Sequence, residues 1–173
     1  IRDVAPSRGL GDVYKRQQGY CQLDPEMLLY TKDRDSIHLS EIKRKEYTLV
    51  LRYSTQCCST CVEDILRKMR KFEEQYPDID ILLFTTYRVQ IEKKDFQRIC
   101  RFFPKVYNVF SLGIPLDEEV VPYLFVLDRG MRVIDTFIPD KDLPKLTNRY
   151  FERITTTLSR NKAYNYKYYK KEI

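Results

Sequence analysis

Three cysteines stand within five positions in the stretch TQCCSTCVE, residues 55–63. Cys58 and Cys61 have C-x-x-C spacing, and Cys57 directly precedes them. Two thiols at this spacing can carry out thiol–disulfide exchange, three adjacent thiols can bind a soft metal ion, and a cysteine can also pack as a small apolar side chain. Which of these applies depends on the elements that hold the cluster.

The cluster is predicted to lie between a strand and a helix. Residues 47–54, YTLVLRYS, are rich in β-formers and predict a buried strand that ends directly before the cysteines. Apolar residues then recur at helical spacing up to Pro77, which ends the helix. These residues are Val62, Ile65, Leu66, Met69 and Phe72. We therefore expect Cys58 in the first turn of a helix that runs to about Tyr76.

A helix N-terminus favours a thiolate, because its unpaired N–H groups carry a partial positive charge. Cysteine pKa values at such positions fall to roughly 3.5–7.5 from about 8.5. Cys58 is therefore the expected attacking thiol. Cys61, one helical turn further on, is the expected resolving thiol.

The remaining pattern predicts an α/β fold. A short strand is expected at 36–40, a second buried strand at 79–87 and a helix that stops before Pro104. Residues 122–138 predict a hairpin that turns at Asp128-Arg129-Gly130, and 143–158 predict a final amphipathic helix. The expected architecture is a mixed central sheet with helices on both faces, and the cysteines lie at the carboxyl end of its strands.

The chain resembles the thioredoxin superfamily, and most closely its TlpA/ResA-type redoxins. The stretches that carry the resemblance are SIHLSEIKRKEYTLVLRYSTQCCSTC and VVPYLFVLDRGMRVIDTF, within about 36–158. The resemblance implies a thioredoxin-like fold and a thiol–disulfide oxidoreductase that acts on protein partners without a cofactor. An upstream redox protein would exchange electrons with it. It also implies a periplasmic or membrane-tethered, extracytoplasmic location, and it leaves the direction of exchange open.

Site residues follow from the same resemblance. Cys58 and Cys61 match the redox pair, and Pro122 matches a cis-proline that faces it. Val121 matches the residue whose backbone contacts a bound polypeptide, and Asp64 matches an acid that helps to deprotonate the resolving thiol.

The sequence departs from that family at two positions beside the pair. Cys57 replaces the usual tryptophan, so it is expected to pair with a client, to take over from Cys58 or to pack in the tryptophan's place. Arg52 falls where thioredoxin has a buried acid, and its side chain is expected near the pair or extended to solvent at the sheet end.

Three other functions remain open. Thr55 precedes Cys58 as in peroxiredoxin-like thiol peroxidases, although the proline of their motif is absent. Cys57 and Cys61 have the C-x-x-x-C spacing of copper-binding SCO-like proteins, but the single histidine, His38, lies upstream. A non-enzymatic interaction module on the same fold is the third alternative.

Charge and composition set the domain boundaries. The net charge is +6, but residues 18–160 contribute only +1, so we do not expect nucleic acid as a partner. Residues 1–17 resemble a translated sequencing adapter, and the native N-terminus with any export signal is then expected to be missing. We expect a lead-in at 18–35, a single domain at 36–160 and a mobile basic Tyr/Lys-rich tail at 161–173.

Overall fold

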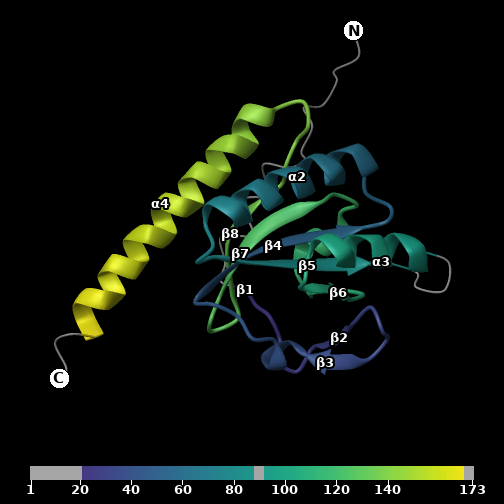
Figure 1. Ribbon diagram of the computed structural model, residues 1–173, viewed down its shortest axis with the longest axis horizontal. Coiled ribbons are helices and arrows are strands. Elements are labelled where there is room, and N and C mark those ends of the chain that lie inside the picture. The colour runs from purple at the N-terminus through teal and green to yellow at the C-terminus, as the bar shows by residue number, and fades with distance from the viewer. Residues whose placement is uncertain (1–20, 88–91, 170–173) are drawn as a thin grey trace, which may run out of the picture.

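Strand β4 (Tyr47–Ser54) forms the centre of the sheet and leads directly into the cysteine cluster. It pairs in parallel with β5 (Asp80–Thr86) and antiparallel with β7 (Tyr123–Asp128). The computed structural model describes residues 21–87 and 92–169 (Figure 1). Within that part of the chain, the sheet has the order β1-β8-β7-β4-β5-β6-β2-β3. Its other strands are β1 (Cys21–Gln22), β2 (Leu28–Tyr30), β3 (Ser36–His38), β6 (Val106–Asn108) and β8 (Arg132–Phe137).

All three α-helices of the described chain pack on one face of this sheet. They are α2 (Ser59–Gln75), α3 (Lys93–Phe102) and α4 (Pro144–Tyr169). Helix α2 connects β4 to β5, and α3 connects β5 to β6, so the two crossovers step in the same direction across the sheet. Parallel crossovers are almost always right-handed, and two that step the same way place their helices on the same face. Figure 1 shows α2 and α3 above the strands that they connect.

The alternation of side chains along β4 divides the core into two layers. Leu49, Leu51 and Tyr53 face the helices, together with the apolar faces of α2 and α4. Val50 faces the other layer. That layer is covered by the 3-10 helices η1 (Leu39–Glu41) and η2 (Pro115–Glu118) and by the loop from Val109.

Most of the predicted elements are confirmed, including the strand at 47–54, the long helix after it and the hairpin. The α/β class with a mixed sheet is confirmed, but the second face carries 3-10 helices and loops rather than α-helices. Helix α4 continues past Asn161 into the expected tail and ends at Tyr169. Residues 1–17 lie outside the described residues, whereas β1 and β2 bring part of the expected lead-in into the sheet.

In the described chain, no helix has the length and apolar character that crossing a membrane requires.

Candidate active site

Helix α2 begins directly after Cys58, which is its N-cap residue. The Cys58 carbonyl accepts the first helical hydrogen bond, from Val62 N, at 3.0 Å. The helix forms because its buried residues recur every three or four positions, and it ends at Gln75, two residues before Pro77. Cys58 is exposed and Cys61 is half-buried, so the outer thiol is accessible to a large partner.

The two thiols differ in acidity. Hydrogen bonds from the Cys61 side chain, the Thr60 hydroxyl and the Cys61 backbone lower the pKa of Cys58 to about 7. The Thr60 oxygen lies 3.1 Å from the Cys58 sulfur. The same Cys61–Cys58 hydrogen bond raises the pKa of Cys61, and burial raises it further. At neutral pH the pair therefore consists of a partly ionised outer thiol and a protonated inner thiol.

Two charged residues from the far end of the chain act on the pair. Lys141 lowers the pKa of both cysteines, and Asp140 raises that of Cys61. They follow β8, which runs antiparallel to β7 and so ends where β4 ends. Neither residue was predicted from the sequence. The signal that could have identified them is the hairpin, because its second strand returns the chain to the cysteine end of the sheet.

Cys57 points into the core rather than toward a partner. It is 8% exposed and belongs to the core layer that α2 covers. Its sulfur accepts a hydrogen bond from Ser54 N at 3.4 Å and lies 3.6 Å from the Ser54 hydroxyl. Of the three interpretations for Cys57, this geometry favours packing in place of the tryptophan over pairing with a client or taking over from Cys58.

Pro122 lies at the cysteine end of the sheet but does not have the expected isomer. It is buried directly before β7, and the register pairs the next residue, Tyr123, with Arg52 of β4. No peptide bond in the described chain is cis, so the prediction of a cis Val121–Pro122 bond is wrong. The trans form of an X–Pro bond is favoured by about 0.5–1 kcal/mol, and η2 with the turn after it leads the chain into β7 without a cis bond. The Val121 N–H donates to Glu119 O at 2.8 Å, so this conformation does not offer it to a bound polypeptide.

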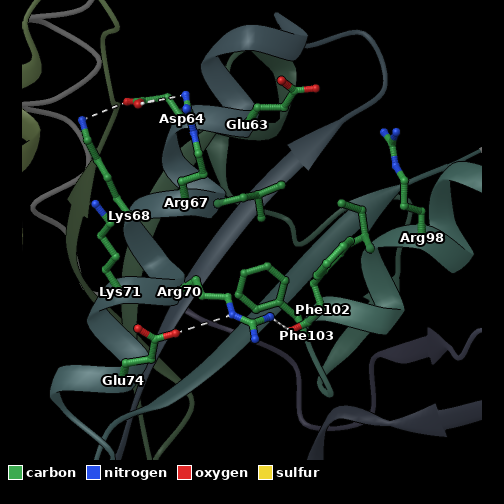
Figure 2. A pocket seen from close by; sticks show the side chains of 12 residues that line it. Glu63, Asp64, Arg67, Lys68, Arg70, Lys71, Glu74, Arg98, Phe102 and Phe103 are labelled. Carbon is green, nitrogen blue, oxygen red and sulfur yellow. Dashed lines mark hydrogen bonds and ion pairs between the residues drawn. The ribbon is translucent and has the colours of Figure 1, made fainter.

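Asp64 is engaged with its own helix. Its carboxylate lies 2.9 Å from Lys68 Nζ and 3.6 Å from an Arg67 guanidinium nitrogen, as Figure 2 shows. The acid that acts on the pKa of Cys61 is instead Asp140. Sequence spacing placed Asp64 on α2 correctly, but it could not show which way the carboxylate points.

Arg52 lies on the sheet face opposite to α2, away from the cysteines. It is buried, and its Nε donates to Asp117 Oδ1 at 2.9 Å. A second nitrogen donates to Phe110 O at 3.0 Å, and Tyr123 OH donates to the same Asp117 oxygen at 2.8 Å. Both expected positions for Arg52, beside the pair or extended to solvent, are therefore wrong. A buried acid 65 residues away holds the guanidinium instead.

Three observations concern the metal-site alternative and the other two cysteines. Within residues 21–87 and 92–169, no three His, Cys, Asp or Glu side chains are arranged to hold a metal ion. His38 is half-exposed on β3, and its ring contacts the Glu26 carbonyl at 2.8 Å. Burial raises the pKa of Cys21 and of Cys100, so neither is activated as Cys58 is.

Comparison with known proteins shows structural similarity without close relatives. Neither protein-family models nor curated proteins match the sequence. Among solved structures, the chain is similar to a domain of a possible thiol-disulfide isomerase from Cytophaga hutchinsonii. That similarity covers 78% of this chain and 95% of that one at 17% identity, with a TM-score of 0.51. The chain is also similar to a thiol peroxidase from Chromobacterium violaceum, over 81% of this chain and 86% of that one at 13% identity, with a TM-score of 0.55.

The fold is thioredoxin-like. In this thioredoxin-like sheet, the two cysteines lie where the central strand passes into its helix. The N-termini of β7 and α4 lie at the same end. The arrangement presents one exposed thiol with a lowered pKa beside a half-buried thiol with a raised pKa.

Proposed function

We propose that the protein catalyses thiol–disulfide exchange with protein partners, with Cys58 as the attacking thiol and Cys61 as the resolving thiol. The observation that carries this proposal is the placement of the two thiols at the start of α2, with Cys58 exposed at the N-cap and Cys61 half-buried in the first turn; their pKa values shift in opposite directions. The reactive species in exchange is the thiolate, and an attacking thiol is most effective when its pKa is near the ambient pH.

The reaction proceeds in two displacements. The Cys58 thiolate attacks a disulfide of the partner, forms a mixed disulfide and releases one partner thiolate, which takes up a proton. Cys61 then loses its proton and attacks the Cys58 sulfur, which releases the second partner thiol. The partner disulfide is reduced by two electrons while the Cys58–Cys61 disulfide forms, and the reverse sequence oxidises a partner dithiol. Asp140, rather than Asp64, influences Cys61: its negative charge raises the pKa of that thiol and so favours its protonated form.

Exposed apolar side chains at the cysteine end of the sheet favour a polypeptide substrate. Phe110 is 81% exposed, Val120 54% and Leu143 50%. They follow β6, precede β7 and follow β8, so all three lie in segments at that end of the sheet. The resemblance to TlpA/ResA-type redoxins further supports an upstream redox protein as the second partner and an extracytoplasmic location.

Insulin disulfide reduction by dithiothreitol tests this function. Cys58→Ser should abolish catalysis. Cys61→Ser should accumulate a mixed disulfide at Cys58, which mass spectrometry detects. Cys100→Ser, a half-buried thiol on α3, is the matched control and should keep parental activity. Full activity of Cys58→Ser would exclude the proposal.

A thiol peroxidase is the second candidate, because the chain shares its fold with the Chromobacterium violaceum enzyme and carries Thr55 before Cys58. A peroxidase that forms a sulfenic acid on Cys58 does not need Cys61 for that first step. Rapid consumption of hydrogen peroxide that survives Cys61→Ser would favour this candidate over disulfide exchange.

A further inference from the structure

A groove of about 900 Å³ lies between α2 and α3, on the outer side of the helical layer. Figure 2 shows it from close by, with α2 side chains along one wall and α3 side chains along the other. Its floor is apolar and is made by Leu66, Ile99, Phe102 and Phe103. Phe102 is 54% exposed, and it joins the other three side chains in a contiguous apolar floor.

The groove is a consequence of the topology. Because both crossovers place their helices on the same face, α2 and α3 lie over neighbouring strands and leave a channel between them. Arg70 spans this channel, since its guanidinium donates to Phe102 O at 3.1 Å. The contact ties the C-terminal end of α3 to α2.

The rim of the groove carries a positive charge. Its lining contains five basic side chains (Arg67, Lys68, Arg70, Lys71 and Arg98) and three acidic ones (Glu63, Asp64 and Glu74). Ion pairs join Asp64 to Lys68 at 2.9 Å and to Arg67 at 3.6 Å, Glu74 to Arg70 at 3.8 Å, and Arg98 to Asp95 of α3 at 3.7 Å. The lining keeps a formal surplus of +2, whereas residues 18–160 as a whole carry +1.

We propose that this groove docks an acidic amphipathic helix of a redox partner protein, and this proposal rests on the proposed function. The apolar face of such a helix would cover Phe102 and the floor, and its carboxylates would meet Arg67, Lys71 and Arg98 on the rim. Glu63, at one end of the groove, is five residues from Cys58, or about 7.5 Å along the helix axis. A helix bound here would place its protein beside the exposed thiol.

Charge argues against other occupants. A second copy of this chain is disfavoured, because its residues 18–160 carry no surplus of negative charge, summing to +1, that would complement a basic rim. An anionic lipid surface suits basic side chains, but it would also have to approach Glu63 and Glu74 and could not fill a concave floor. A narrow, acidic polypeptide element fits both the shape and the charge.

The test uses a fluorescein-labelled synthetic peptide that forms a helix with leucine and phenylalanine on one face and glutamate on the other. Fluorescence anisotropy should show binding that weakens as salt is added. Arg67→Glu/Lys71→Glu, a change of two exposed residues on α2, should weaken binding by about tenfold or more. Phe102→Ala should also weaken peptide binding, because it removes apolar contact area from the floor of the groove. The matched control is Arg129→Glu/Arg149→Glu, which makes the same charge change at two exposed positions outside the groove and should leave the affinity within about twofold.

Several outcomes would overturn the proposal. They are no binding by the folded parent, equal binding of a peptide with lysine in place of glutamate, and unchanged binding by both groove variants. Binding of phosphatidylglycerol vesicles that the groove variants abolish, without an effect on the peptide, would assign the groove to lipid instead. The docking test is independent of thiol chemistry: Cys58→Ser should bind the peptide as the parent does. Arg67→Glu/Lys71→Glu should reduce a small aromatic disulfide at the parental rate.

Discussion

The Cys58 sulfur and the Thr60 hydroxyl oxygen lie 3.1 Å apart at the first turn of α2. A hydroxyl in this position donates to the thiolate, as does the Cys61 thiol one turn further on. The dipeptide Ser59-Thr60 between the two cysteines therefore lowers the pKa of the attacking thiol, because the Thr60 hydroxyl is a hydrogen-bond donor.

The first prediction concerns this donor set. The pH dependence of alkylation of Cys58 by iodoacetamide, followed by peptide mass spectrometry, should have its midpoint near pH 7. Cys61→Ala removes the strongest donor and should move the midpoint upward, and Thr60→Val should move it in the same direction by less. Ser59→Ala is the control and should leave it unchanged. A parental midpoint at or above about 8.5, the value of a free thiol, would contradict the assignment of Cys58 as the activated thiol.

The second prediction concerns Lys141. Its ammonium favours the thiolate of Cys58, so Lys141→Ala should raise the pKa of that thiol and slow alkylation below neutral pH. Cys58 is fully exposed and water screens the pair, so the rate should fall by less than about fivefold, and added salt should remove the difference. Lys145→Ala, an exposed lysine in the first turn of α4, is the matched control. A faster reaction of Lys141→Ala would exclude the electrostatic role.

The third prediction concerns the buried pair of Arg52 and Asp117. Burial alone would raise the pKa of Asp117, but hydrogen bonds from Arg52 and from Leu112 N–H hold it below its ordinary value. A carboxylate with a depressed pKa stabilises the fold above its unfolded pKa of about 3.9, and this contribution is lost as the pH falls through the folded pKa. Asp117→Asn leaves a buried charge unpaired and should lower the free energy of unfolding by about 3–5 kcal/mol at pH 7.

Urea unfolding at pH 7 and at pH 3 checks this. The difference in free energy of unfolding between the parent and Asp117→Asn should be smaller at pH 3, because the parental carboxylate begins to protonate there. Asp95→Asn, which breaks an exposed pair with Arg98 on α3, is the control and should cost less than about 1 kcal/mol. If Asp117→Asn and Asp95→Asn lower the free energy of unfolding equally, the Arg52–Asp117 pair contributes no more than a surface ion pair.

These residues also mark the limit of what the sequence could predict. The strand at 47–54, the helix after it and the places of Cys58 and Cys61 were predictable, because short-range periodicity and spacing determine them. Lys141 and Asp117 were not, because each reaches its partner through strand order and register rather than through neighbours in the chain. The isomer of Pro122 was taken from a resemblance, and the chain's own route through η2 does not require it.

The last prediction concerns Cys57. Its sulfur is buried against Ser54 and belongs to the core, so its replacement should affect packing more than chemistry. Cys57→Ala should keep exchange activity within about tenfold of the parent, since the Cys58–Cys61 pair stays intact. It should also lower the free energy of unfolding by about 1 kcal/mol, the value for one buried atom of this size.

Disulfide mapping of the oxidised protein decides which thiols pair. A bond between Cys57 and Cys58 would distort the peptide bond between them, and one between Cys57 and Cys61 would require the first turn of α2 to open. Cys58 and Cys61 lie one helical turn apart and can pair without either change. A dominant Cys57–Cys61 bridge would refute this pairing. Exchange activity that remains in Cys58→Ser but disappears in Cys57→Ala/Cys58→Ser would identify Cys57 as a second attacking thiol.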